Sequence, residues 1–392
     1  MKFVNRGVKI LIVNRLMGIR RGGGEYFDYY IARELQKMGN EVKFIIGKKG
    51  KSDVDLGLPD FGTVYISTPY LRDYYYWWEE KRFRPLRIIG SAILDLDLYL
   101  FEKRVFDYLK TSDRFEFDLV QLCGLPRLGS WIEEKLQVPT SIIWHGEPSK
   151  RGIRWGKQCS FHVGIGAAYP RVRDYIDSNT LQLEPGIDTD VFVRRQKTRI
   201  RDLLNLNQDS VVFIFVGRLI PVKNLPFMLE GFYEVLKENS KVHLLIVGDG
   251  PGRKSLMQFV KEKGMNKNVT FTGNIEREKV VDYYSAADVF IITSKYESFS
   301  LVVLEAMSCS LPLIVSSSGW LPRLIKDGEN GKVIDPDDIC NLKEAILFMA
   351  NNKSWRDEVG KRNRNFAFQY SWGKSAFKLI SFYREILKIE KK

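Results

Sequence analysis

The chain has 392 residues, of which 44% are hydrophobic and 13% aromatic, and this apolar content excludes disorder of the whole chain. Single hydrophobic cores stop growing at roughly 250–300 residues, so the length favours two domains. The formal net charge of +13 favours anionic partners, which include nucleotides, sugar phosphates, nucleic acid and anionic membrane surfaces.

Short apolar runs alternate with amphipathic segments along the whole chain. The predicted strands are residues 8–13, 42–46, 118–122, 140–144 and 161–165 in the first half, and 211–216, 242–247, 269–272, 289–293 and 313–315 in the second. They lack two-residue alternation, which is typical of strands buried on both faces of a parallel sheet. The segments between them predict helices, so the chain is expected to form two doubly wound α/β domains.

A domain boundary is predicted at residues 184–201, where Pro185 and Gly186 interrupt the apolar pattern. We therefore expect one domain over residues 1–190 and a second over residues 191–372. The remaining residues, 373–392, predict a helix whose apolar stripe runs through Phe377, Ile380 and Tyr383.

The sequence has no apolar run near the roughly 20 residues that span a bilayer. The run at residues 10–13 is short and lacks a cleavage site, so it predicts a first strand and not a secretion signal. The four cysteines are scattered, which suggests a reducing, cytoplasmic compartment, and with only three histidines no structural zinc site is expected.

Three glycines, residues 22–24, lie between the first predicted strand and the next helix. Glycines at such a turn let the backbone approach a ligand, and a helix N-terminus offers free N–H groups to an anion. The spacing is not that of a dinucleotide-binding G-x-G-x-x-G motif. The turn is thus either a phosphate contact or an ordinary flexible turn.

Two cations, Arg218 and Lys223, follow the predicted strand at residues 211–216. Open α/β sheets bind ligands at the carboxyl ends of their strands, and a guanidinium beside an ammonium suits a diphosphate. The alternative is a solvated loop with ordinary basic residues. The glycine-rich segment at residues 248–252 follows the next strand, and we interpret it primarily as a turn.

The segment ESFSLVVLE carries Glu297 and Glu305 with seven residues between them. Ser298 or Ser300 is expected to cap a helix, so that both carboxylates and the first helical N–H groups face one crevice. A carboxylate accepts hydrogen bonds from paired sugar hydroxyls, and helix N–H groups hold phosphate. The alternative is a pair of solvated acids.

These residues resemble the family-4 retaining glycosyltransferases of GT-B architecture. ESFSLVVLE is followed by AMSCSLPLIVSSSG and preceded by EPGIDTDVF, VGRLIPVKN, LLIVGDGP, FTGNI and YYSAADVFIITS, in the family's order and spacing. The match is strong over residues 183–336 and weaker in the first half. The resemblance implies two Rossmann-like domains facing a cleft, with the C-terminal helix crossing back to the first domain. Ser310 stands where the family commonly has glycine, which should alter a turn.

The resemblance also implies a role for each matching residue. Arg218 and Lys223 would bind the diphosphate of a nucleotide-sugar donor, with the Ser300 and Leu301 amides near the phosphates. Glu305 would hold the ribose hydroxyls and Glu297 the transferred sugar. The backbone at Asn274 and Ile275 would read the base, Gly23 and Gly24 would close on the diphosphate, and His145 would lie near the reacting sugar. His145 could equally satisfy a buried strand end.

The implied reaction is retaining sugar transfer, in which the leaving diphosphate takes the acceptor's proton on the same face. Electrostatic stabilisation of the leaving charge would then do most of the catalytic work. No cofactor or metal is expected, because metal-binding spacing is absent. Glu297 as a covalent nucleophile is the competing mechanism, and it is disfavoured because a carboxylate that holds sugar hydroxyls is poorly placed for attack.

First domains in this family receive the acceptor, and here residues 74–84 place aromatic side chains beside cations. This pattern suits a membrane interface. We therefore expect a glycan or lipid-linked acceptor and a peripheral site at the inner membrane face, with ordinary helix packing as the alternative. Other functions on this sequence are a nucleotide-sugar epimerase and a nucleic-acid-binding protein. The positive charge is shared between both halves and no nucleic-acid module appears, so nucleic acid is not an expected partner.

Overall fold

The computed structural model describes residues 6–19, 22–49, 61–68, 84–112, 116–176 and 179–388. The chain divides into two compact units. Unit 1 comprises Met1–Pro185 together with Trp372–Lys392, and unit 2 comprises Gly186–Ser371. Both ends of the chain therefore belong to the same unit.

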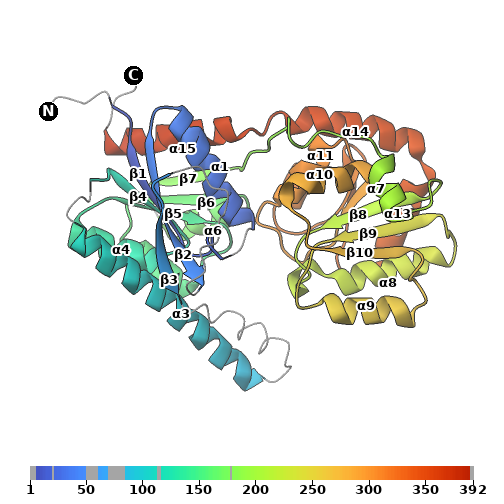
Figure 1. The fold of residues 1–392 in the computed structure, drawn as a ribbon, viewed down its shortest axis with the longest axis horizontal. Helices are drawn as coiled ribbons and strands as arrows, with labels where there is room; N and C mark the ends of the chain where they lie inside the picture. The colour runs from blue at the N-terminus through green and yellow to red at the C-terminus, as the bar shows by residue number, and fades with distance from the viewer. Residues whose placement is uncertain are drawn as a thin grey trace. The chain divides into compact units, whose positions relative to one another are not determined.

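Unit 1 contains a seven-stranded parallel sheet in the order β3-β2-β1-β4-β5-β6-β7 (Figure 1). Its strands are β1 (Lys9–Asn14), β2 (Glu41–Lys49), β3 (Val64–Thr68), β4 (Leu119–Cys123), β5 (Thr140–Trp144), β6 (Phe161–Ile165) and β7 (Thr180–Leu183). The order reverses beside β1, as in a doubly wound sheet, so the predicted fold class is confirmed for this unit. The edge strands β3 and β7 are additional to those predicted.

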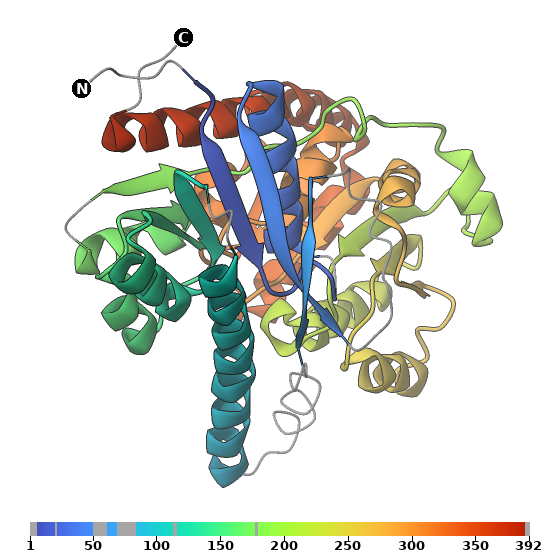
Figure 2. The ribbon, with the colours of Figure 1, turned by 60° about the vertical axis from the view of Figure 1, so that its left-hand side comes forward.

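The helices of unit 1 are α1 (Gly23–Lys37), α3 (Arg84–Thr111), α4 (Pro126–Leu136), α5 (Lys150–Gly156), α6 (Ala168–Tyr175) and α15 (Trp372–Leu387). The long helix α3 projects beyond the sheet at its N-terminal end (Figure 2). Its C-terminal part packs on the core through Phe101 and Val105. Arg127 on α4 links the two helices, because its guanidinium lies 2.6 Å from Asp95 and 3.3 Å from Glu102, which are both on α3.

The C-terminal helix α15 is part of unit 1, as the resemblance implied. Its Tyr383 hydroxyl donates to Gln121 Oε1 at 3.1 Å and shares a second hydrogen bond with the Ser141 hydroxyl at 2.8 Å. The predicted apolar stripe is wrong at Phe377, which is 55% exposed. The buried face instead follows Trp372, Ala376, Leu379, Ile380 and Tyr383, because the helix turns the small Ala376 toward the unit.

Unit 2 contains a six-stranded parallel sheet in the order β10-β9-β8-β11-β12-β13. Its strands are β8 (Val211–Val216), β9 (Val242–Val247), β10 (Val269–Gly273), β11 (Val289–Ile292), β12 (Leu313–Ser316) and β13 (Gly331–Ile334). Its helices are α7 (Thr198–Leu203), α8 (Leu225–Leu236), α9 (Arg253–Glu262), α10 (Arg277–Ala286), α11 (Leu301–Ser308), α12 (Leu321–Leu324), α13 (Ile339–Asn351) and α14 (Lys353–Ala367). This is again a doubly wound sheet, with β13 as the additional edge strand.

The basic cluster at residues 194–201 is structural. Arg201 is fully buried, donates to the carbonyls of Ala286, Gln208 and Ser210, and lies 2.6 Å from Asp288. Lys197 contacts the other oxygen of Asp288 at 2.5 Å. A buried guanidinium needs such a set of partners, so this cluster fixes the start of unit 2 to the corner before β11.

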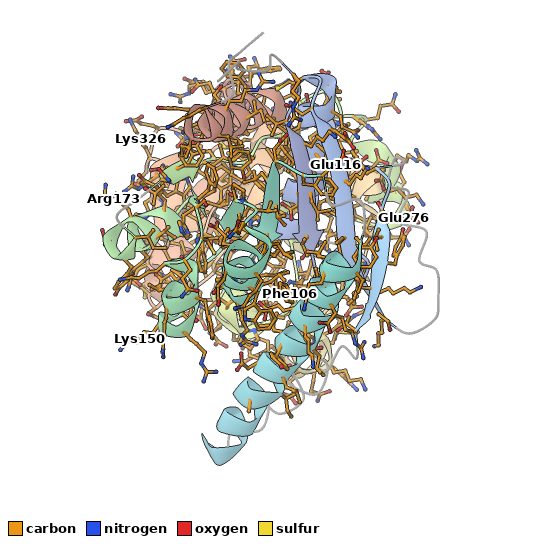
Figure 3. The ribbon with its side chains drawn as sticks, turned by 90° about the vertical axis from the view of Figure 1, so that its left-hand side faces the viewer. Phe106, Glu116, Lys150, Arg173, Glu276 and Lys326 are labelled. Carbon is orange, nitrogen blue, oxygen red and sulfur yellow. The ribbon has the colours of Figure 1, made fainter. Side chains whose placement is uncertain are left out.

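Other charges lie at the surface of each unit (Figure 3). Glu116, Lys150 and Arg173 are exposed in unit 1, and Glu276 and Lys326 are exposed in unit 2. Phe106 on α3 instead packs edge-on against Trp131, with ring centroids 5.8 Å apart. Among the described helices, none combines the length and apolarity that crossing a bilayer requires.

Candidate functional site

Lys223 and Glu297 meet at the carboxyl ends of the neighbouring strands β8 and β11. Lys223 ends a short 3-10 helix, Pro221–Lys223, and Glu297 lies in the loop before α11. Lys223 Nζ lies 2.5 Å from Glu297 Oε1, and the Ser294 hydroxyl donates to the same oxygen at 2.6 Å. The Lys223 side chain is 17% exposed and that of Glu297 is 9% exposed, so the pair is largely desolvated. Removing either partner would leave a poorly hydrated charge.

The loop that carries Glu297 is held by the segment after β12. The Trp320 amide donates to the Glu297 carbonyl at 2.9 Å. Gly319 has φ +62°, and a Cβ there would lie 2.0 Å from that carbonyl oxygen. Only glycine permits this approach, so the last residue of the SSSG motif fixes the position of Glu297.

Glu305 on α11 is buried and has its own partners on α10. Arg277 Nη2 lies 2.7 Å from Glu305 Oε1, and the Tyr284 hydroxyl donates to Oε2 at 3.0 Å. Burial, together with the nearby Glu305 carboxylate, raises the pKa of Tyr284 well above its ordinary value. Tyr284 therefore remains a protonated donor to Glu305. The alternative of solvated acids is wrong for both Glu297 and Glu305, which are 7% and 2% exposed.

The start of α11 differs from the predicted serine cap. Ser300 occupies the N-cap position, but it has φ +77° and its side chain makes no capping hydrogen bond. Its buried hydroxyl has no hydrogen-bond partner among the described residues. A capping serine normally has an extended backbone, so the left-handed conformation explains the difference. The first N–H groups of a helix lack partners within the helix, which leaves the Leu301 amide available to an acceptor.

Arg218 is exposed and forms no ion pair within the described part of the chain. The neighbouring glycine-rich segment, residues 248–252, leads through a turn at residues 251–252 into α9, as its interpretation as a turn predicted. Gly248 has φ +138°, and a Cβ there would lie 1.9 Å from the Gly217 carbonyl oxygen. The ends of β8 and β9 can approach this closely because residue 248 is glycine.

Asn274 and Ile275 follow β10, and the Asn274 side chain is exposed. They directly precede α10, which begins at Arg277 and brings its guanidinium to Glu305. The structure thus connects the segment predicted to read the base with the residue predicted to hold the ribose.

In unit 1, the structure brings Gly24 and His145 together. A Cβ on Gly24 would lie 3.3–3.5 Å from three atoms of the His145 ring, and Phe27 packs edge-on against that ring at 5.1 Å. Burial lowers the pKa of His145 to about 4, so the imidazole is neutral at pH 7. Its Nε2 is buried with no hydrogen-bond partner among the described residues, which argues against a merely satisfied strand end. Gly23 is the first residue of α1 and is exposed.

The sequence matches to known proteins include a family model that covers most of unit 2. Residues 196–366 match the family model described as Glycosyl transferases group 1. The matched residues all lie within unit 2. A D-inositol 3-phosphate glycosyltransferase from Geodermatophilus obscurus is 30% identical over 216 residues, covering 52% of this chain and 47% of the relative. The alpha-D-kanosaminyltransferase of Streptomyces kanamyceticus is 27% identical over 200 residues, covering 51% of each chain. The chain spans about half the length of these curated relatives.

Similarity to solved structures extends over nearly the whole chain. Sucrose-phosphate synthase from Thermosynechococcus elongatus gives a TM-score of 0.80 at 19% identity, covering 98% of this chain and 100% of that one. Anabaena Alr3699/HepE in complex with UDP-glucose gives 0.74 at 17% identity, covering 95% and 99%. Identities this low establish the fold alone, which is GT-B.

Within the region that matches the Glycosyl transferases group 1 model, three residues around the acids were not singled out from the sequence: Arg277, Tyr284 and Ser294. Tyr284 belongs to the YYSAADVFIITS block, and Arg277 lies two positions after Ile275. Their places in the chain pointed to this region. The contacts of Arg277 and Tyr284 with Glu305 did not follow from sequence spacing, because they depend on how α10 packs beside α11 in the fold.

Proposed function

We propose that the protein is a retaining glycosyltransferase that moves a sugar from a nucleotide-diphosphate sugar to a glycan or lipid-linked acceptor. The observation that carries the proposal is the pair of buried carboxylates, each held by a cation, inside the region that matches the Glycosyl transferases group 1 model. Names of the relatives support transferase activity, and the UDP and UDP-glucose complexes of the Anabaena protein support a nucleotide-sugar donor.

The observed contacts leave room for the proposed donor. An ammonium has three donors, and Lys223 uses one on Glu297, so two can reach a diphosphate. A carboxylate has about four acceptor sites, and Glu305 has one contact on each oxygen, so it can also accept from ribose hydroxyls. Arg218, exposed at the end of β8, would add a second cation for the phosphates.

The proposed mechanism is front-face transfer without a metal. Lys223, Arg218 and the amides of Ser300 and Leu301 would stabilise the charge that develops on the leaving diphosphate. The alternative, Glu297 as a nucleophile, is less favourable because Lys223 and Ser294 both bind its Oε1 and reduce its nucleophilicity. The roles of Gly23, Gly24 and His145 near the reacting sugar, and of Asn274 and Ile275 near the base, complete the proposal.

The acceptor side of the proposal rests on unit 1. The aromatic-basic stretch at residues 74–83 lies outside the described residues, and so do the side chains of residues 84–87. A lipid-linked acceptor at an anionic membrane surface on the cytoplasmic side, as in polysaccharide or glycolipid biosynthesis, therefore stays a prediction from composition.

The test is an NMR assay of the sugar product, with donor hydrolysis as the readout if no acceptor is found. We expect the anomeric configuration of the donor to be retained. Lys223→Ala should lower the rate at least about 100-fold, a loss typical of removing a charged contact to the developing leaving group. Glu305→Gln removes a charged acceptor of the ribose hydroxyls and should weaken donor binding. Lys237→Ala, which removes an exposed ion pair with Glu234, is the matched control and should keep full activity.

Three results would count against the proposal. An inverted product would exclude retention. An epimerised nucleotide sugar would favour the epimerase alternative. Full transfer by Lys223→Ala would show that the site is misassigned.

A further inference from the structure

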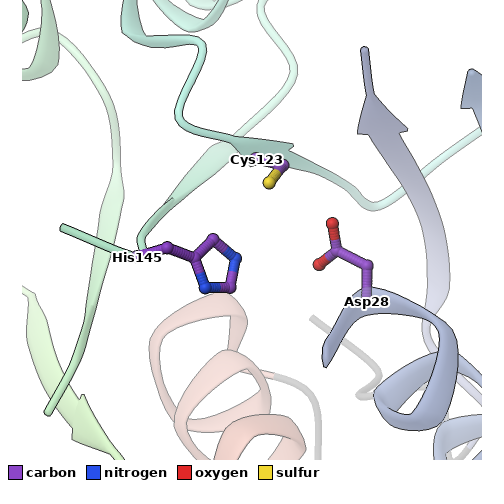
Figure 4. A group of neighbouring side chains, drawn as sticks. All are labelled: Asp28, Cys123 and His145. Atoms are coloured by element: carbon purple, nitrogen blue, oxygen red, sulfur yellow. The ribbon is translucent and has the colours of Figure 1, made fainter. Parts of the chain in front are cut away.

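A cluster of three potential metal ligands lies at the carboxyl end of the unit 1 sheet. Asp28 is on α1, Cys123 ends β4, and His145 follows β5. One carboxylate oxygen, the Cys123 Sγ and one His145 ring nitrogen all lie within 4.8 Å of one another. Figure 4 shows the three side chains converging, with a ring nitrogen of His145 facing Asp28. Because β4 and β5 are neighbours in the sheet, residues 22 positions apart in the chain meet here.

The carboxylate of this cluster is oriented by two amides. Asn14 Nδ2 donates to Asp28 Oδ2 at 2.8 Å, and Gln121 Nε2 donates to Oδ1 at 3.0 Å. The Asn14 Oδ1 accepts the Leu16 and Met17 amides, which fixes the direction of its side chain. Hydrogen bonds of this kind hold metal-binding carboxylates in place in known sites, so the support that a first ligand needs is already built.

The other two side chains are in states suited to metal binding. His145 Nε2 is buried and has no hydrogen-bond partner among the described residues, although a buried polar atom without a partner is costly. The Cys123 thiol hydrogen-bonds Asp28, so an ion entering the cluster would displace one thiol proton to solvent.

We propose that Asp28, Cys123 and His145 bind one zinc ion. A thiolate, an imidazole and a carboxylate together are typical zinc ligands, whereas magnesium and calcium prefer oxygen ligands alone. Ligand atoms around tetrahedral zinc lie about 3.3–3.8 Å apart, so separations of up to 4.8 Å must close by about 1 Å. Side-chain rotation at Cys123 and His145 can supply this movement, and the fourth position is open to water.

This site shares His145 with the proposed transfer reaction, but its measurement does not depend on that reaction. The groups that would stabilise the leaving diphosphate belong to unit 2, and none of them is a ligand here. Zinc binding and nucleotide binding are therefore measured independently, and failure of one leaves the other standing.

The experiment titrates zinc into the full chain, freed of metal with a chelator, at pH 7.5 in competition with a chromophoric zinc indicator. We expect one zinc ion per chain. Cys123→Ser and His145→Ala should each weaken binding at least about 100-fold, since even supporting residues contribute about 10–100-fold. Cys340→Ser removes the exposed thiol of unit 2 and is the matched control; it should bind zinc as tightly as the parent chain.

Cobalt(II) provides a second measurement that needs no variant. A thiolate-to-cobalt absorption band should appear with the parent chain and should be absent from Cys123→Ser. Absence of that band from the parent chain would overturn the proposal even if a variant failed to fold. Equal zinc affinity in the parent chain and Cys123→Ser would overturn it too, as would loss of binding in Cys340→Ser.

Discussion

Tyr284 is the neutral hydrogen-bond donor to Glu305, and its ring is fully buried. Tyr284→Phe keeps the ring and removes only the hydroxyl, which leaves Glu305 held by Arg277 alone. We expect the KM for the nucleotide-sugar donor to rise about 5–30-fold, the equivalent of a hydrogen bond of about 1–2 kcal/mol, with a much smaller change in kcat. Steady-state kinetics measure the split. The neighbouring Tyr283→Phe should change neither constant, and an equal effect of both variants would contradict the positioning role.

Buried His243 is expected to make the free energy of unfolding of unit 2 depend on pH. Burial, with the positive charge of Arg201 adding, lowers the pKa of His243 to about 4, against about 6.5 in the unfolded chain. Below pH 6.5 the unfolded state binds a proton that the folded state does not, so the free energy of unfolding falls as the pH falls from 6.5 to about 4. His243→Gln can retain the hydrogen bond to Thr270 and removes this titration.

Urea unfolding at pH 7, 6 and 5 measures the difference. Between pH 7 and pH 5 the parent chain should lose about 1–2 kcal/mol more stability than His243→Gln. Parallel pH profiles for the two proteins would contradict this account of His243.

At the same scale, the sequence predicted which acids and cations make the site but not how they pair. Lys223 was assigned to phosphate and Glu297 to sugar, and the structure places them in contact with each other. Ion pairing depends on which strands are neighbours in the sheet. Strand β8 lies beside β11, although 72 residues separate the end of β8 from the start of β11 in the chain. Sequence spacing alone carries no such information.

At the scale of elements, the central strands and the edge strand β10 were predictable, and the other edge strands were not. Strands β5, β6, β8 and β9 have the predicted bounds, because both faces are buried and their apolar runs are continuous. The strands that the sequence did not reveal are β3, β7 and β13, which are all edge strands with partly exposed residues. An edge strand packs against one neighbour only, so its sequence needs less apolar character.

Ser310 ends α11 in a strained conformation. Its φ is +59°, in the left-handed region that glycine adopts at little cost and other residues adopt at about 1–2 kcal/mol. Glycine would remove this strain, but it also raises the backbone entropy of the unfolded chain, which offsets part of the gain. Ser310→Gly should therefore stabilise unit 2 by about 0.5–1 kcal/mol. The melting temperature should rise by about 1–4 °C, as measured by calorimetry. Ser354→Gly, at the exposed start of α14, is the control and should lower it; a fall with Ser310→Gly would contradict the assigned strain.

At the scale of the whole molecule, composition and length indicated two domains but could not show that the chain ends in the first of them. Tyr383 establishes that connection, since its hydroxyl reaches Gln121 and Ser141 in the middle of the unit 1 sheet. The structure also accounts for part of the net charge of +13. Part of the excess is structural, at Arg201 and Lys197, and part lies at the candidate site, at Arg218 and Lys223.

The measurement that tests the central claim most directly is a thermal-shift screen over nucleoside diphosphates and their sugars. A ligand at 100 times its dissociation constant should add about 2.7 kcal/mol of stability, or about 5–10 °C for a unit of this size. We predict that at least one nucleotide gives this shift, that Lys223→Ala and Glu305→Ala reduce it strongly, and that Lys237→Ala keeps it. No response to any nucleotide, or an undiminished response in both site variants, would contradict a nucleotide-sugar site in unit 2.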